Sequence, residues 1–191
     1  MINYNLPTSV IVDNKEYPIN KKGDYRVILD IIQVFNDKTL SDQEKAITAL
    51  CIFFGYNEEE GQFILPENIE EALNEVSKFI DCGNESKNDT KPQPKLMDWE
   101  QDFYLIVPPL NKVLGYEVRS VEYLHWWTFI GAYMEIGGDC VFSQVKDIRL
   151  KRSKGEKLDK SEQAFFRENR EMILFKDELS QEDEDWLNSD D

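Results

Sequence analysis

The chain has 191 residues, of which 41% are hydrophobic, 12% aromatic and 31% charged, a composition that is typical of a globular protein and excludes a wholly disordered chain. Its formal net charge of -16 repels phosphate groups, which argues against a general nucleic-acid binder and against a binder of anionic membranes. A basic or a hydrophobic partner is favoured instead.

The sequence shows no sign of membrane insertion or secretion. No apolar run approaches the roughly 20 residues that cross a bilayer, and the N-terminus lacks a basic region followed by an apolar one. Cys51, Cys82 and Cys140 are an odd and widely spaced set, which favours buried, reduced thiols over a disulfide framework. We therefore expect a cytoplasmic protein.

The N-terminus is predicted to form a short β-hairpin. Apolar residues occupy 10–12 and 17–19, and Asn14 lies between them in a turn-forming stretch.

Three helices are expected to follow the hairpin. Apolar residues fall at helical spacing over 25–35, and Ser41 with Glu44 forms a capping box at the start of a second helix that Gly55 ends. A third helix is expected from Pro66 to about Ile80.

Residues 83–97 contain no large apolar side chain before Leu96 and are rich in Asn, Lys, Ser and Pro, which indicates a linker or a long exposed loop. Helical spacing resumes at Trp99 and runs to Gly115. Pro108 and Pro109 lie within this span and should kink or restart the helix.

The next predicted helix is the most aromatic part of the chain. Ser120 is expected to cap it, and its apolar residues share one broad face: Tyr123, Trp126, Trp127, Ile130, Tyr133 and Met134. Core packing is the simpler explanation of this face, and a contribution to a partner surface is the alternative.

Two further helices are expected, one around Val145 and one from Phe165 to Ile173, with a charged connection over 151–160. Residues 177–191 hold eight Asp or Glu residues and no Lys or Arg, a block typical of a disordered tail. Trp186 within this block is either incidental or a docking anchor.

These patterns predict a mainly α protein with a short N-terminal β-hairpin, a helical bundle in two units and an acidic disordered C-terminal tail. The predicted parts are a hairpin and three-helix unit at 1–82, a linker at 83–97, an aromatic-rich helical unit at 98–176 and the tail at 177–191.

No pattern predicts catalysis, a cofactor or a metal site, so we expect a protein that is not an enzyme. His125 is the single histidine, and a polar or boundary position one turn after Glu122 is expected for it. The run from Glu58 to Glu60 beside Gly61 lacks the alternating ligands of a calcium loop and is interpreted as a solvated acidic turn. Basic residues over 146–170 alternate with acids, which favours a solvated helix face or pairing with the acidic tail over nucleic-acid binding.

Four sequence motifs together carry a family resemblance. They are Asp98-Trp99-Glu100-Gln101-Asp102-Phe103, then Leu114-Gly115-Tyr116, then Leu124-His125-Trp126-Trp127 with Phe129, and finally Val145 with Ile148-Arg149. In combination they resemble the bacteriophage gene-product-fifteen family, whose members are encoded among the tail genes of long-tailed phages and prophages of Gram-positive bacteria.

The resemblance implies a tail assembly chaperone that acts in the host bacterial cytoplasm and is absent from the mature virion. Its partners would be the tape-measure protein, which it keeps soluble while the tail tube assembles, and other tail proteins, with homo-oligomerisation left open. The candidate motif or partner-binding residues are Trp99, Asp102, Leu124, His125, Trp126, Trp127 and Trp186.

Two alternatives remain at this stage. One is a structural tail or head-tail connector component that is retained in the virion. The other is an acidic inhibitor that mimics DNA, which the mixed charge of residues 98–176 disfavours.

Overall fold

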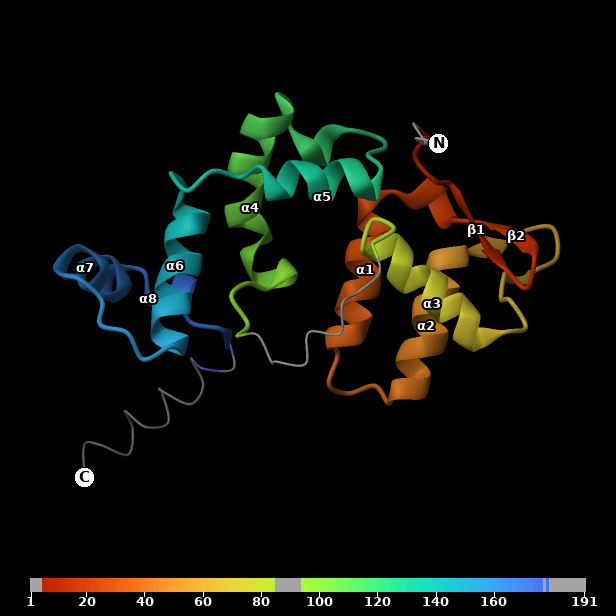
Figure 1. Ribbon diagram of the computed structural model, residues 1–191, viewed down its shortest axis with the longest axis horizontal. Coiled ribbons are helices and arrows are strands. Elements are labelled where there is room, and N and C mark those ends of the chain that lie inside the picture. Colours follow the sequence, from red (N-terminus) through yellow and green to blue (C-terminus); the bar gives the residue numbers. More distant parts are fainter. Residues whose placement is uncertain (1–4, 85–93, 177, 179–191) are drawn as a thin grey trace. The chain divides into compact units, whose positions relative to one another are not determined.

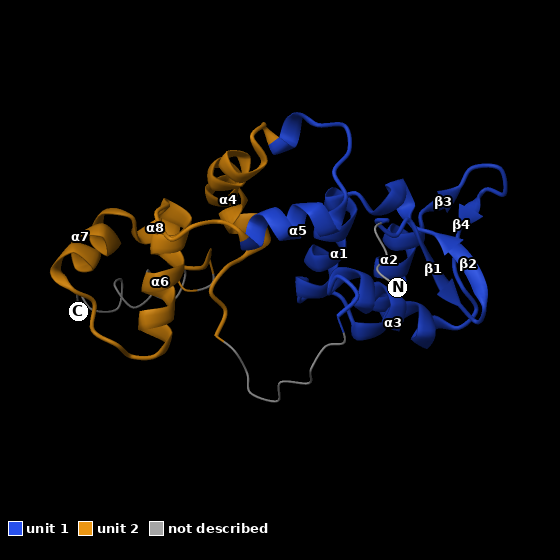
Figure 2. Ribbon diagram, turned by 45° about the horizontal axis from the view of Figure 1, so that its top comes forward, with its two compact units in different colours: residues 1–89, 118–134 blue, residues 90–117, 135–191 orange. Residues whose placement is uncertain are grey.

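The structure is a computed structural model that describes residues 5–84, 94–176 and 178 (Figure 1). The chain divides into two compact units (Figure 2). Unit 1 comprises residues 1–89 and 118–134, and unit 2 comprises residues 90–117 and 135–191. Both are mainly helical and unit 1 begins with a β-hairpin, which confirms the predicted fold class.

The predicted N-terminal hairpin is confirmed. Strands β1 (Ser9–Val12) and β2 (Lys15–Pro18) pair antiparallel. Asp13 and Asn14 form the turn with φ values of 50° and 61°, the left-handed backbone that a two-residue hairpin turn requires.

The three predicted N-terminal helices are confirmed as α1 (Tyr25–Asn36), α2 (Asp42–Phe54) and α3 (Ile69–Ile80). The capping box of Ser41 and Glu44 is present at the start of α2. Helix α3 begins after Pro66, because the Asn68 side chain accepts a hydrogen bond from the Glu71 amide and fixes the first turn there.

A second, very short hairpin was not predicted. Strands β3 (Tyr56–Asn57) and β4 (Gln62–Phe63) pair antiparallel between α2 and α3. The acidic turn expected at Glu58 to Glu60 is the loop of this hairpin. Each strand has only two residues, which is too short for an alternating pattern to reveal it.

Unit 1 is completed by two 3-10 segments, η1 (Asn20–Gly23) and η2 (Val118–Ser120), and by helix α5 (Trp126–Met134). The prediction that Ser120 caps the aromatic helix is wrong. Residues 121–125 are extended or bent because the Leu124 backbone bonds to Asp24 and Tyr25 at the start of α1. Helix α5 packs on α1 and buries Trp126, Phe129 and Ala132.

Unit 2 contains α4 (Trp99–Leu114), α6 (Val141–Ser153), α7 (Lys160–Glu168) and α8 (Arg170–Ile173). The sequence predicted a kink or a restart at Pro108 and Pro109, and both residues lie inside α4, which runs through them without a restart. The helix is fixed at both ends, by the Asp98 side chain at its start and by Gly115 with a φ of 79° at its end.

The last predicted helix is divided in two. Asn169 lies between α7 and α8 with φ -125° and ψ 35°, outside the helical region, and its side-chain amide donates to the Phe165 carbonyl at 3.0 Å. The core of unit 2 consists of apolar residues from α4, α6 and the C-terminal segment: Leu105, Ile106, Val107, Leu110, Phe142, Val145, Ile148, Ile173 and Leu174.

The division into units differs from the predicted one. Residues 118–134 were assigned to a unit at 98–176, yet they belong to unit 1, because their contacts are with α1 and α3. Most of the predicted linker, residues 85–93, and nearly all of the acidic tail with Trp186 lie outside the described residues. Across the described ranges, no helix combines the length and the apolar character that a membrane crossing needs.

Candidate functional site

The residues of the family motifs gather in two places, one in each unit. In unit 1, Leu124 is attached to the start of α1. The Asp24 carboxylate caps α1 by accepting the Arg26 amide at 3.0 Å, and its second oxygen accepts the Leu124 amide at 2.9 Å. The Tyr25 amide donates to the Leu124 carbonyl at 2.9 Å. Asp24 is 2% exposed, so these bonds form out of contact with water.

His125 follows and is also buried, at 1% exposure, so the predicted boundary position is wrong. Its Nε2 lies 2.9 Å from the Pro7 carbonyl oxygen, and its Nδ1 accepts the Trp127 amide at 3.1 Å. Because the Pro7 oxygen can only accept, Nε2 carries a proton, and because Nδ1 accepts the Trp127 amide it carries none, so the ring is neutral. Burial lowers the pKa of His125 below its ordinary value, and the bond to Pro7 opposes this shift.

Trp126 and Trp127 both bond to the end of α3. The Trp126 indole N–H donates to the Ile80 carbonyl at 2.9 Å, and the Trp127 indole N–H donates to the Phe79 carbonyl at 2.8 Å. The last carbonyls of a helix lack partners within the helix, and the two indoles supply donors at this end of α3 in addition to the backbone amides of Asp81, Cys82 and Gly83.

The aromatic rings of this region form a stack inside unit 1. Trp126 is 2% exposed and packs on Phe129 with ring centroids 5.7 Å apart. Phe129 in turn stacks on Tyr25 at 4.4 Å with the two planes only 4° apart. Of the face predicted for the aromatic helix, Trp126 is buried as core packing requires, and Trp127, Ile130 and Tyr133 are partly buried. Tyr123 and Met134 are 46% and 72% exposed, so core packing does not account for them.

Gly23 allows the close approach of these groups. Its φ is +75°, and a Cβ atom at this position would lie 2.6 Å from Cζ of Phe79 and 3.2 Å from Nε2 of His125. Only glycine fits both the backbone conformation and the space.

In unit 2, the motif residue Asp102 forms an ion pair with Arg149. Asp102 lies on α4 and is 0% exposed, and Arg149 lies on α6 and is 4% exposed. The two carboxylate oxygens accept from Nη1 at 2.5 Å and from Nη2 at 2.9 Å, a bidentate arrangement. Asp102 also accepts the Asp98 amide at 2.8 Å.

Arg149 uses its remaining donors on backbone carbonyls. Nε donates to Ile173 at 2.7 Å, Nη1 to Leu96 at 3.1 Å and Nη2 to Met172 at 3.0 Å. All five N–H groups of the guanidinium are thus engaged. The guanidinium also lies 4.2 Å from the centroid of the Phe175 ring. A single side chain therefore ties α4, α6 and two chain segments together.

The other motif residue of unit 2, Trp99, is the first residue of α4 and is partly buried. Gln101 on the same helix donates to the Leu174 carbonyl at 2.7 Å and accepts the Lys176 amide at 3.2 Å. Together with Arg149, Gln101 fixes the segment that leads into the acidic tail.

The buried polar side chains of the motifs thus form bonds within the protein. Throughout the described parts of the chain, every buried side-chain nitrogen or oxygen has a hydrogen-bond partner, and no three His, Cys, Asp or Glu residues are grouped so as to hold a metal ion. Cys51, Cys82 and Cys140 are free and partly buried. Burial raises the pKa of the Cys51 and Cys82 thiols, so both stay protonated near neutral pH.

The structure separates the predicted site residues into two groups. Leu124, His125, Trp126 and Trp127 lie together in unit 1, and Trp99 and Asp102 lie in unit 2. Trp186 lies outside the described residues. Asp24, the partner of Leu124, was not predicted as a site residue, and Arg149 was predicted only as part of a motif.

A signal for Arg149 was available in the sequence. Asp102 lies four residues before Ile106 and Arg149 lies four residues after Val145, so each charge falls on the apolar stripe of its helix. Opposite charges on two such stripes indicate a buried ion pair. Asp24 directly precedes Tyr25, the first residue of the helical pattern, which is a local signal for its role as helix cap, but no local signal marks its bond to Leu124.

Comparison with known proteins gives one match. The family model described as Bacteriophage Gp15 protein matches residues 2–173, which spans nearly the whole chain and includes all four sequence motifs. Among curated proteins and among solved structures, nothing matches the chain. The chain therefore belongs to the Bacteriophage Gp15 protein family.

Proposed function

We propose that this phage protein is a tail assembly chaperone that binds the tape-measure protein and keeps it soluble until the tail tube forms around it. The proposal makes it a non-enzymatic protein without a cofactor. It would work in the cytoplasm of the host bacterium and leave before the virion is complete.

Membership of a bacteriophage family is the observation that carries this proposal. The structure adds a physical reason to look for partner binding at the surface. The buried polar side chains of the family motifs form hydrogen bonds within their own unit, so they stabilise each unit internally and are not presented to a ligand.

The described surface carries the kind of side chains that a chaperone needs. Large apolar residues at least 40% exposed occur on both units, among them Ile11, Phe35, Ile47, Tyr56, Phe63, Tyr104, Tyr116 and Met134. A tape measure is a long helical chain with extended apolar stripes, and such stripes are covered by apolar contacts spread over a surface. The net charge of -16 would keep the loaded complex soluble.

Co-expression with the tape-measure protein of the same phage tests the proposal. The tape measure alone should sediment with the insoluble fraction, and with this protein it should remain in the supernatant and copurify with it. An insoluble tape measure in the presence of abundant, folded protein would contradict the proposed function.

A further inference from the structure

The short hairpin between α2 and α3 presents two aromatic side chains to solvent. We call residues 55–65 the aromatic hairpin. Tyr56 and Phe63 are direct cross-strand partners, so their side chains lie on the same face. They are 53% and 51% exposed, and their rings meet edge to face with centroids 5.3 Å apart. Leu65 beside them is 40% exposed.

The aromatic hairpin has a defined local geometry. The Asn57 side chain accepts the Glu59 amide at 3.0 Å, and the Gly61 amide donates to the Asn57 carbonyl at 2.9 Å. Gly61 has a φ of +67°, which closes the turn. At the base, the Ile64 amide donates to the Gly55 carbonyl at 3.0 Å. The backbone that carries the two exposed rings is therefore fixed by these hydrogen bonds.

The aromatic hairpin is also attached firmly to unit 1. Gly55 packs against the Asn20 side chain, where an added Cβ would lie 3.0 Å from the Asn20 Cγ. The side-chain amide of Asn20 donates to the Ile52 carbonyl at 2.9 Å, near the end of α2. Gly55 and Asn20 are needed to attach the hairpin to the end of α2. The exposed rings of Tyr56 and Phe63 are not needed for this attachment.

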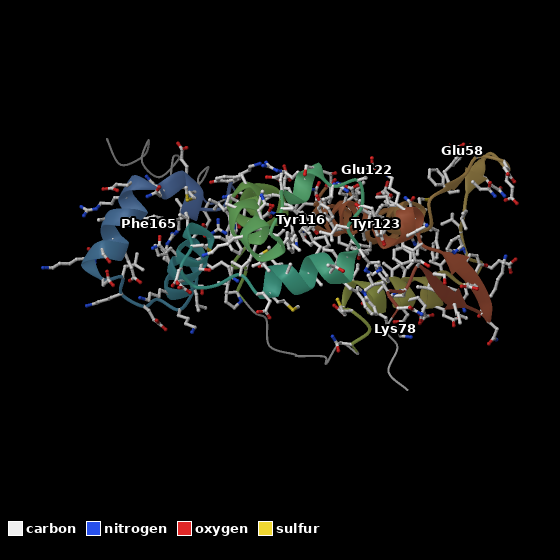
Figure 3. The ribbon with its side chains drawn as sticks, turned by 90° about the horizontal axis from the view of Figure 1, so that it is seen from above. Glu58, Lys78, Tyr116, Glu122, Tyr123 and Phe165 are labelled. Atoms are coloured by element: carbon white, nitrogen blue, oxygen red, sulfur yellow. The ribbon has the colours of Figure 1, made fainter. Side chains whose placement is uncertain are left out.

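The stretch of sequence that carries the rings has only acidic charged residues. Between Lys45 and Lys78 the sequence has seven glutamates and no Lys or Arg. Glu58, Glu59 and Glu60 form the loop of the hairpin, and Figure 3 shows Glu58 on this loop. Within the parts of the chain that the structure describes, Glu58 and Glu59 have no ion-pair partner.

Exposed aromatic rings next to glutamates favour a partner segment that is both apolar and basic. Exposed aromatic rings bury apolar side chains and also attract Lys and Arg through the faces of their π systems. Carboxylates beside the rings pair with the same cations. A second copy of this chain is a poor fit, because two proteins of net charge -16 repel each other.

We propose that the aromatic hairpin is a docking site for a basic amphipathic segment of a partner protein, with apolar side chains against Tyr56, Phe63 and Leu65 and with Lys or Arg against Glu58 to Glu60. The inference deepens the proposed function and rests on it for the nature of the partner as a protein. It adds the surface and the chemistry of the segment that this surface takes.

The test uses the full-length protein and a fluorescently labelled synthetic peptide in which Lys and Leu recur at helical spacing. Binding is measured by fluorescence anisotropy, and circular dichroism confirms that each variant is folded. Two control peptides replace every Lys by Glu or every Leu by Ser. The Lys and Leu peptide should bind the protein, and both control peptides should bind much more weakly.

Variants then locate the binding. The double change Tyr56→Ser with Phe63→Ser should weaken binding about tenfold or more, because it removes both rings. The triple change of Glu58, Glu59 and Glu60 to Gln should weaken binding at low salt and flatten its dependence on salt between about 50 and about 300 mM. Val113→Ser is the control for loss of an exposed apolar side chain outside the hairpin, since Val113 is 42% exposed on α4, and it should change binding less than about twofold.

Two results would overturn the inference. The first is unchanged peptide affinity in the double variant, which would mean that the peptide binds elsewhere on the acidic surface. The second is a wild-type dimer in sedimentation velocity that the double variant abolishes, which would make the hairpin an interface between copies. The peptide assay contains no tape measure, so a failed co-expression experiment would leave its result unchanged.

Discussion

Asp102 and Arg149, which are 47 residues apart in the sequence, form a buried bidentate ion pair between α4 and α6. Both belong to the sequence motifs that carry the family resemblance. Arg149 also donates hydrogen bonds to three backbone carbonyls. The pair therefore connects α4 and α6 to the chain segments before α4 and at α8, all within unit 2.

Replacing one partner of this pair should be severely destabilising. Arg149→Met leaves the Asp102 carboxylate buried without its cation and three carbonyls without donors, so we expect a loss of about 3 to 5 kcal/mol in the free energy of unfolding. Urea denaturation measures it. Lys154→Met, at an exposed position just after α6, is the control and should change stability by less than about 0.5 kcal/mol.

A double replacement separates the ion pair from the carbonyl bonds. Asp102→Leu combined with Arg149→Met removes both charges, which is often nearly neutral for a buried pair alone. Here the double variant should still be clearly less stable than wild type, because the carbonyls of Leu96, Met172 and Ile173 lose their donors and the Asp98 amide loses its acceptor. Wild-type stability in the double variant would show that these four bonds contribute little.

The two tryptophans should differ in the size of their contribution. Trp126→Ala removes a ring that is 2% exposed and should cost about 3 to 5 kcal/mol in chemical denaturation. Trp127→Phe keeps an aromatic ring at a partly buried position and removes one hydrogen bond to Phe79, so about 1 kcal/mol is expected. If Trp127→Phe abolishes partner binding without affecting stability, the residue belongs to an interface instead.

His125 should make stability depend on pH. Its pKa is lowered in the folded protein, so the unfolded chain takes up the proton first as the pH falls through the ordinary histidine value of about 6.5. The stability that neutral His125 contributes is therefore complete above that pH and is lost as the pH falls below it. Between pH 8 and about pH 5.5, wild type should lose more stability than His125→Gln in urea denaturation at matched pH values. Parallel losses in both proteins would contradict a buried neutral imidazole.

Two glycine replacements should have opposite effects. Gly23→Ala places a Cβ at a φ of +75° and 2.6 Å from the Phe79 ring, which should cost about 2 to 4 kcal/mol. Gly131→Ala lies within α5 with nothing inside 4 Å of the added Cβ, and it should stabilise the protein by about 0.5 to 1 kcal/mol. Thermal unfolding of the two variants tests the sign. Similar losses in both would show that the close approach at Gly23 does not matter.

The acidic tail yields a prediction from its charge alone. Residues 177–191 supply eight of the negative charges of the chain, so truncation after Lys176 should change thermal stability little but reduce the solubility of complexes with the tape measure. Sedimentation after co-expression compares the two forms. Equal soluble yields would rule out a solubilising role, and loss of binding on Trp186→Ala would make the tail an anchor.

Local patterns predicted much of the fold. The capping box of Ser41 and Glu44 and the terminal Gly115 fixed two helix ends correctly, because the interactions that set them lie within a few residues. The start of α5 at Trp126 was missed because it depends on Asp24, about 100 residues away, which holds the Leu124 amide. The burial of His125 depends on Pro7 in the same way. Pairing across such distances leaves no periodicity in the sequence.

The most direct test of the proposed chaperone role is quantitative mass spectrometry of infected cells and of purified phage particles. We expect the protein to be abundant in the cell lysate, copurifying with the tape measure, and absent from particles that contain the tape measure at its usual copy number. A fixed stoichiometric copy number in purified particles would contradict the account and identify the protein as a structural component of the virion.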